Sequence, residues 1–247
     1  MGHDYEDQAR LTLDASPEEV WEAIATGPGM DAWFMGRTEV QPGEEGRVRA
    51  DMGGFVQEFD VTAWEPPRRL KFETRPTENG SFIALEWLIE ARSGSTVLRS
   101  VGSGFIGSDD WSDEYDALRQ GGVRYLRNLS QYLTHFRGRP AVPINAAWPH
   151  AGSRDEMWSA LRRGLDLPEQ IEEGNQVRLS PKDFAPIDGV IDYATPAGIG
   201  IRGEEGLYRF FRGMGGLVAI EHHLFGDDID ARATQQAWQS WLASQLT

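Results

Sequence analysis

Residues 55–63 read FVQEFDVTA, and this stretch decides the fold class. Apolar or amide side chains hold the odd positions from Phe55 to Ala63, and acidic or hydroxyl side chains hold the even positions from Glu58 to Thr62. A period of two places alternate side chains on opposite faces of a β-strand. Similar alternation continues over residues 70–74, 82–91 and 96–105, with Asn79-Gly80 as a hairpin signal. Successive strands joined by short turns predict an antiparallel meander.

Helical signals lie on both sides of this meander. Residues 9–14 read as a short strand, and Ser16-Pro17-Glu18-Glu19 then forms a capping box that begins a helix. Gly27-Pro28-Gly29 is expected to end that helix, and residues 30–34 are expected to form a short second one. Ser16 accepts from the exposed backbone N–H groups of the first turn, and Pro17 needs no N–H partner there.

A long amphipathic helix is predicted over residues 111–137, where apolar side chains recur every three and four positions. Gly121-Gly122 lies in its middle and weakens it by about 1 kcal/mol per Gly relative to Ala. The glycine pair indicates either close packing of this helix against the sheet or a kink beside a cavity.

The second half of the chain repeats the beginning of the first. Residues 153–161, SRDEMWSAL, align with residues 16–24, SPEEVWEAI, with four identities. Alternating segments follow at 190–195, 198–202, 207–212 and 217–225, and a final helix is expected over 230–246. We therefore predict two domains, 1–138 and 139–247, of which the second is a shortened copy of the first.

Composition excludes several classes of protein. The formal net charge of −15 repels phosphate backbones and anionic lipids, so we expect neither a nucleic-acid partner nor a membrane partner. The chain has no cysteine, and its polar, acidic start does not resemble a secretion signal. His222 and His223 are adjacent on a predicted strand and point to opposite faces, and no metal-binding motif is present. We expect a cytoplasmic protein without metal or cofactor.

The first half resembles the START-related helix-grip (SRPBCC) superfamily, and more narrowly the family of homologues of the activator of the heat-shock-protein-90 ATPase. The segments that carry the resemblance run in the family's order over roughly residues 8 to 138: Ser16–Trp21, Trp33-Phe34, Gly53–Phe55, Val61–Leu70, Thr96–Phe105 and Gly122–Leu133. One departure is Val123, where the family usually has Trp after the glycine.

The resemblance implies an α+β, START-like fold in which a curved antiparallel sheet wraps around a long C-terminal helix, with a cavity between sheet and helix. We expect two such domains in tandem. Bulky rings on both walls of such a sheet rarely interdigitate without gaps, and apolar gaps bind small molecules. The expected ligand-binding residues are Trp33, Phe55, Gln57, Phe59, Phe72, Trp87, Arg99, Trp111, Tyr115, Tyr125 and Leu129.

These observations favour binding of a hydrophobic, aromatic small molecule over catalysis. The alternatives are a polyketide cyclase or aromatase, in which groups such as Arg99, Ser100, Gln57 or Tyr125 would orient the substrate, a regulator of a chaperone ATPase, and an antibiotic self-resistance protein. No catalytic residue is singled out by the sequence. The ligand, the oligomeric state and the presence of a pocket in the second half all stay open.

Overall fold

The computed structural model describes residues 2–107, 111–150, 152–213 and 216–246, without the side chains of residues 111 and 113. The chain divides into two compact units, Met1–Pro140 and Ala141–Thr247. Each unit has its own antiparallel sheet and its own helices, so the α+β class and the tandem arrangement expected from the sequence are confirmed.

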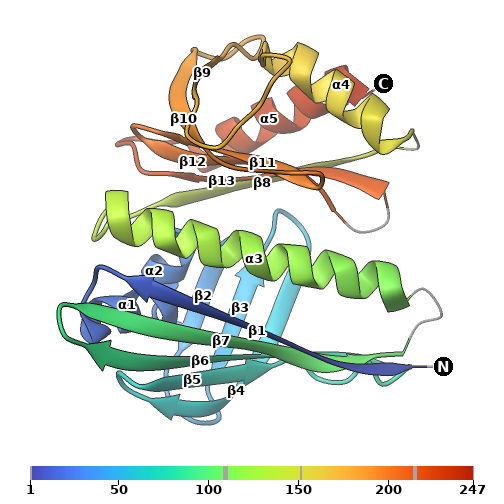
Figure 1. Ribbon diagram of the computed structural model, residues 1–247. Helices are drawn as coiled ribbons and strands as arrows, with labels where there is room; N and C mark the ends of the chain where they lie inside the picture. Colours follow the sequence, from blue (N-terminus) through green and yellow to red (C-terminus); the bar gives the residue numbers. More distant parts are fainter. Residues whose placement is uncertain (1, 108–110, 151, 214–215, 247) are drawn as a thin grey trace. The chain divides into compact units, whose positions relative to one another are not determined.

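Within the described residues the first unit has a seven-stranded sheet and three helices. The strands lie in the order β1-β7-β6-β5-β4-β3-β2, so a meander from β2 to β7 is closed by β1. Helix α3 runs along one face of this sheet (Figure 1). The elements of the first unit are β1 (His3–Leu13), α1 (Pro17–Ala25), α2 (Gly27–Asp31), β2 (Arg37–Gln41), β3 (Arg47–Asp51), β4 (Val56–Glu65), β5 (Arg69–Glu73), β6 (Phe82–Arg92), β7 (Ser95–Ile106) and α3 (Trp111–His135).

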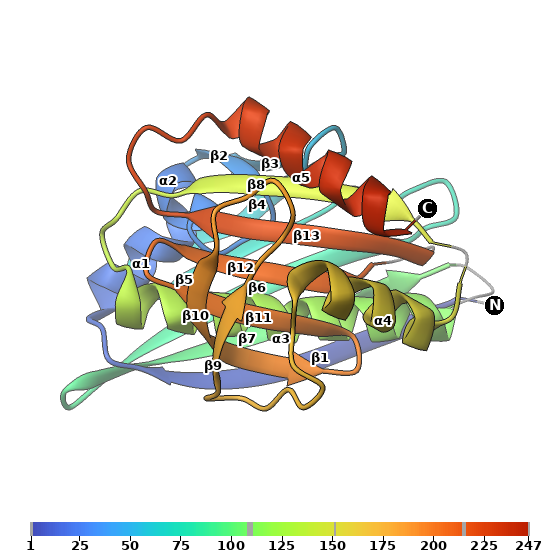
Figure 2. The ribbon, with the colours of Figure 1, turned by 90° about the horizontal axis from the view of Figure 1, so that it is seen from above.

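The second unit, over its described residues, repeats this arrangement with one strand and one helix fewer. Its strand order is β8-β13-β12-β11-β10-β9, so again the first strand pairs with the last and the others descend in sequence. Helices α4 and α5 lie over the same face of the sheet (Figure 2). The elements are β8 (Val142–Pro149), α4 (Arg154–Leu165), β9 (Gln176–Leu179), β10 (Ile187–Thr195), β11 (Gly198–Gly203), β12 (Gly206–Arg212), β13 (Leu217–Leu224) and α5 (Ala231–Leu246).

Both copies of the repeated segment begin a helix in the same way. Ser16 Oγ accepts a hydrogen bond from the Glu19 N–H (3.2 Å), and the Glu19 carboxylate accepts one from the Ser16 N–H (2.7 Å). Ser153 and Glu156 repeat both bonds at the same distances. The predicted capping boxes are therefore present at α1 and α4, where they satisfy N–H groups that the first turn leaves unpaired.

The prediction for the second helix was wrong by about one turn. Helix α2 spans Gly27–Asp31, whereas the sequence suggested a break at its first residues. The Thr26 hydroxyl accepts a hydrogen bond from the Gly29 N–H (3.0 Å) and so caps the helix. Pro28 lies in the first turn, where a missing N–H costs nothing.

The core of the first unit lies under the C-terminal half of α3. From residue 126 onward this helix contributes several buried apolar side chains, whereas its described residues before 126 are half-buried or exposed. Six aromatic rings form a continuous cluster beneath it, with centroid separations of 5.0–6.3 Å: Trp33, Phe34, Phe59, Phe72, Trp87 and Tyr125. The contacts among these rings fill this end of the interior.

Candidate functional site: the inner face of β1 and β7

The inner face of β1 lies toward the N-terminal half of α3. Burial alternates along this strand, so that Tyr5, Asp7 and the next odd-numbered residues are shielded and their even-numbered neighbours are exposed. The Tyr5 ring lies 5.8 Å from the Tyr115 ring of α3, edge to face. Because residues two apart on a strand share a face, Asp7 points to the same side as Tyr5.

Two glycines leave room between this strand pair and the helix. Gly102 of β7 lies opposite Asp7, and a Cβ added to it would meet only Leu85 Cδ2, at 3.8 Å. A Cβ added to Gly122 of α3 would meet no atom within 4 Å outside its own helix. Gly122 is in phase with Tyr125, which contacts Phe34 of the core, so it faces the sheet. The sequence allowed two interpretations of the glycine pair, and the structure excludes the one in which the helix packs closely against the sheet there.

We call this region the β1–β7 wall. It consists of the strand residues Tyr5, Asp7, Leu85 and Gly102 and the facing helix residues Tyr115, Leu118 and Gly122. All seven are half-buried, in contrast to the ring cluster at the other end of the interior, where five of the six rings are at most 2% exposed. Half-buried apolar side chains beside small residues are what an accessible small-molecule site requires.

The Tyr5 hydroxyl is a polar group of this wall whose protonation state follows from its burial. Burial raises the pKa of Tyr5 to about 12, because an ionised phenolate would lose its hydration there. The phenol is therefore neutral at every physiological pH and is available as a hydrogen-bond donor. Gly104 lies opposite Tyr5, and a Cβ there would collide with the Phe82 carbonyl oxygen and crowd the Tyr5 ring, so a glycine is needed at this position.

Five of the residues predicted to bind a ligand fill the core of the first unit. Trp33, Phe59, Phe72, Trp87 and Leu129 are all at most 2% exposed. The Trp33 indole N–H is already donated to the Ala23 carbonyl (2.8 Å). Tyr125 is half-buried and lies at the edge of the ring cluster, and Tyr115 is the predicted residue that reaches the β1–β7 wall.

The structure places two of the predicted residues away from the inner wall. Phe55 precedes β4, follows two glycines with positive φ angles, and is 63% exposed, so it is not part of the inner wall. Arg99 is exposed on the outer face of β7, where its guanidinium donates to the Gln8 side chain (2.7 Å). The inward neighbour is Ser100, whose hydroxyl accepts a hydrogen bond from the Trp87 indole (3.1 Å).

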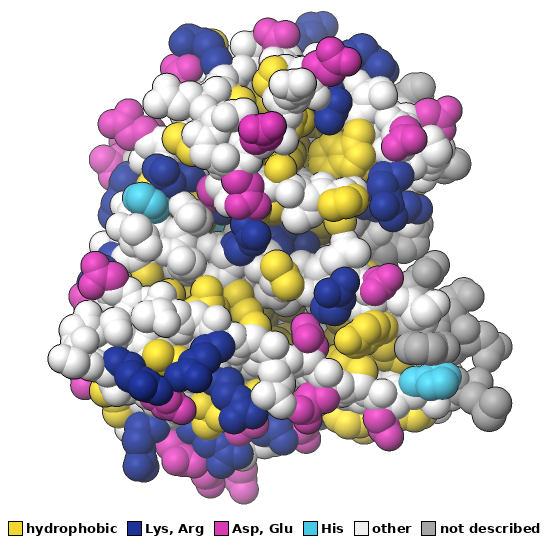
Figure 3. All heavy atoms as spheres, in the orientation of Figure 1, with side chains coloured by type: hydrophobic (Ala, Val, Ile, Leu, Met, Phe, Trp, Pro, Cys, Tyr) yellow, Lys and Arg dark blue, Asp and Glu magenta, His cyan; other side chains and the backbone are white. Residues whose placement is uncertain are grey.

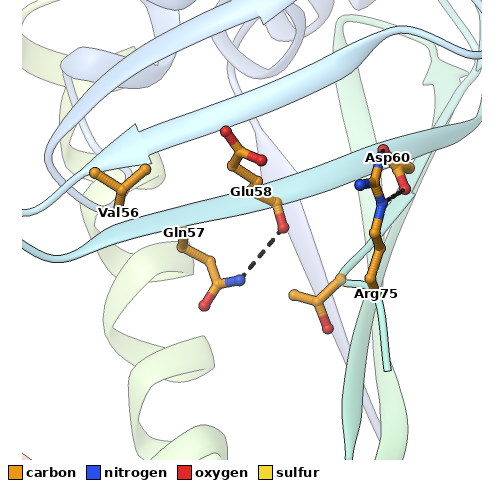
Figure 4. A pocket seen from close by; sticks show the side chains of 6 residues that line it. Val56, Gln57, Glu58, Asp60 and Arg75 are labelled. Carbon is orange, nitrogen blue, oxygen red and sulfur yellow. Dashed lines mark hydrogen bonds and ion pairs between the residues drawn. The ribbon is translucent and has the colours of Figure 1, made fainter. Parts of the chain in front are cut away.

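Gln57 and Trp111 do not extend the site. Gln57 lines an open surface hollow of about 400 Å³ at the start of β4, together with the Asp60–Arg75 ion pair (2.8 Å) (Figure 4). Its amide donates to the Glu58 carbonyl (3.3 Å). The side chains of Gln57, Asp60 and Arg75 thus already bond to one another or to the backbone. The side chain of Trp111 lies outside the described residues, although the helix begins there.

Tyr5 and Asp7 are site residues that sequence reasoning missed. The strand was expected at residues 9–14, but β1 starts six residues earlier, at His3. The alternation Tyr5, Asp7, Ala9, Leu11 was a usable signal. Asp7 made this alternation hard to recognise, because a carboxylate is unusual on the inner face of a half-buried strand.

The interior of the second unit is filled by aromatic side chains. The Trp238 ring stacks on Phe184 at 4.1 Å and lies 4.6 Å from His222, and Trp241 and Phe210 complete the group. His222 is fully buried, and its Nδ1 accepts a hydrogen bond from the Arg209 N–H (3.1 Å). His223 points to the other face, beside Glu221 (3.8 Å), as expected for neighbours on a strand.

His222 predicts acid sensitivity of the second unit. Burial lowers the pKa of His222 to about 3, from 6.5, because the charged imidazolium would be desolvated. The unfolded chain therefore binds the extra proton between these values, and stability falls as the pH drops below 6.5. We expect a loss of about 1.4 kcal/mol per pH unit within this window.

Chemical denaturation at pH 7 and pH 4.5 measures this effect. The variant His222→Asn keeps an acceptor for the Arg209 N–H and cannot titrate, so its stability should change less over the same interval. Equal pH dependence in the wild type and His222→Asn would contradict the assignment.

Other kinds of site find no support in the described part of the chain. No group of three or more His, Asp or Glu side chains there is arranged to hold a metal ion. Among the same residues, no helix is both long and apolar enough to span a membrane. On the face drawn in Figure 3, acidic and basic side chains are interspersed, without the broad basic surface that a nucleic acid requires.

Comparison with known proteins gives a family match within the first unit. Residues 14–134 match the family model "Activator of Hsp90 ATPase homolog 1-like protein". No curated protein matches the chain.

Similar solved structures include protein MLL2253 from Mesorhizobium loti (20% identity, TM-score 0.48, covering 53% of this chain and 98% of that one). DynU16, a protein in the dynemicin biosynthetic locus, is 16% identical, with a TM-score of 0.47 and coverages of 97% and 96%. The di-domain ARO/CYC BexL from the BE-7585A biosynthetic pathway is 13% identical, with a TM-score of 0.45 and coverages of 97% and 94%. The first unit of this chain thus matches the Activator of Hsp90 ATPase homolog 1-like family over residues 14–134, a little under half of the chain.

Proposed function

We propose that the first unit binds a hydrophobic, aromatic small molecule between the β1–β7 wall and the N-terminal half of α3. The observation that carries this proposal is the free space at Gly102 and Gly122, on facing elements. A cytoplasmic binding protein fits a chain without cysteine, and sequestration or transport of a ligand needs no further group.

The chemistry of the wall supports an aromatic ligand. Leu85 and Leu118 supply apolar surface, and the rings of Tyr5 and Tyr115 supply edges and faces for stacking. The phenol of Tyr5 adds one hydrogen-bond donor that fixes orientation. A mostly apolar wall with a few polar groups is typical of small-molecule sites.

Binding is favoured over catalysis by what the wall contains. Cyclisation of a poly-carbonyl chain needs a positioned acid and base within hydrogen-bond reach of the substrate. Among the described residues of the β1–β7 wall, no two side chains form a hydrogen-bonded acid–base pair. The cyclase alternative therefore has no specific residue pair in its favour.

Nuclear magnetic resonance of the ¹⁵N-labelled protein tests the proposal. On titration with a neutral aromatic probe, 1-naphthalenemethanol, the amide signals of Gly102 and Gly122 should move. The Gly200 amide provides an internal reference, because a Cβ there would collide with Asp192 and Tyr193, and no probe can enter. Saturable shifts confined to the second unit, or none at millimolar probe, would refute binding at this wall.

A further inference from the structure

Asp7 is a carboxylate on the inner face of the first unit. The β1–β7 register is continuous from His3 to Leu13 and pairs Tyr5 with Gly104 and Asp7 with Gly102. An uninterrupted register keeps Tyr5 and Asp7 on one face, and the contact of Tyr5 with Tyr115 shows that this face looks toward α3 (Figure 1). The Asp7 side chain is half-buried there.

The charges of the sheet are otherwise placed on its outer face. The register and the burial of the intervening residues put the following cations outside: Arg10, Arg47, Arg49, Arg69, Lys71 and Arg99. The inward positions of the seven strands hold no Lys or Arg, and Asp7 is their single carboxylate. The exposed His3 begins β1 on the same face. No hydrogen bond or ion pair joins the Asp7 carboxylate to another described residue of the unit.

Space and aromatic rings surround this carboxylate. Opposite residues on paired strands have their Cβ atoms about 5 Å apart, so the missing side chain of Gly102 leaves a position free beside Asp7. The Tyr5 and Tyr115 rings lie on the same wall. The face of an aromatic ring attracts cations, and a carboxylate attracts them more strongly. An anion would meet repulsion from Asp7 and no compensating Lys or Arg on the sheet.

We propose that the ligand of the first unit carries a protonated amine, which Asp7 holds beside the rings of Tyr5 and Tyr115. This inference rests on the proposed function and narrows the ligand from an aromatic molecule to an aromatic amine. The amine N–H groups donate to the carboxylate of Asp7, and the aromatic body lies against Leu85 and Leu118.

Three probes of one shape test the charge preference: 1-naphthylmethylamine, which is a cation at pH 7, neutral 1-naphthalenemethanol and anionic 1-naphthoate. Calorimetric titrations run in 0.5 M NaCl screen the general field of a protein with net charge −15. In the wild type the amine should bind at least tenfold more tightly than the alcohol, and the anion more weakly than both. In Asp7→Asn the amine should lose this advantage and bind no more tightly than the alcohol.

The variant Asp4→Asn is the matched control. Asp4 lies on the same strand, is exposed and occupies the outer face. The substitution therefore removes the same negative charge at a position away from the wall. Its preference for the amine should equal that of the wild type. If the alcohol binds but the amine gains nothing, or if Asp4→Asn weakens amine binding as much as Asp7→Asn, the inference about the amine is wrong and the proposed function stands. If no naphthalene compound binds, both are wrong.

Discussion

Replacing Asp192 with Ala is expected to lower the free energy of unfolding of the second unit by about 3–5 kcal/mol. The Arg209 side chain is 0% exposed, and its two terminal nitrogens bond to the two Asp192 oxygens at 3.1 and 2.8 Å. The guanidinium also donates to the carbonyls of Ile201 and Tyr208, which are neutral. Without Asp192, a buried positive charge loses the carboxylate that holds it in this bidentate pair.

Hydrogen exchange of the β12 and β13 amides measures this loss within the second unit. The control is Asp188→Ala, which breaks the exposed pair with Arg178 (3.1 Å) and should cost under about 1 kcal/mol. The double variant Asp192→Ala/Arg209→Met removes both charges and should recover a large part of the stability. Equal losses in Asp192→Ala and Asp188→Ala would show that burial adds nothing to this pair.

The periodic elements of the fold were predictable because their signals are local. The strands from β4 to β7, the long helix α3 and the two capping boxes all follow from side-chain spacing and N-terminal capping residues. The repeated nine-residue segment also indicated the tandem arrangement, and the two sheets share their strand order. Helix α2 was misplaced because Thr26 caps a helix whose first residues, Gly27-Pro28-Gly29, usually end one.

The site was harder to predict because it depends on register and packing. Alternation alone requires Arg99 and Ser100 to face opposite sides, but only the pairing with β1 and β6 decides which of them faces inward. Phe55 was one residue too early, since β4 starts at Val56, after a glycine turn. Which rings contact one another is decided by several distant segments, so a list of aromatics cannot separate core from ligand wall.

The largest expected effect on function comes from Gly122. In Gly122→Leu, a side chain enters the space where a Cβ now meets no atom within 4 Å outside its helix, and aromatic probes should lose about 100-fold in affinity. The reason is steric: the leucine occupies the volume that the ligand needs between α3 and the β1–β7 wall. Helix stability should not fall, because leucine is a far better helix former than glycine.

Gly122→Ala separates this blocking effect from a change in the helix itself. It gives the same gain in helix propensity, about 1 kcal/mol, and adds one methyl group to a space with room for it. Thermal unfolding should therefore shift upward in both variants, whereas calorimetric titration with 1-naphthalenemethanol should show binding in Gly122→Ala and little in Gly122→Leu. If the leucine variant is as stable as the alanine variant and still binds with wild-type affinity, the ligand does not lie beneath Gly122. If both variants lose binding equally, the effect lies in helix rigidity, because a single methyl group is too small to fill the space.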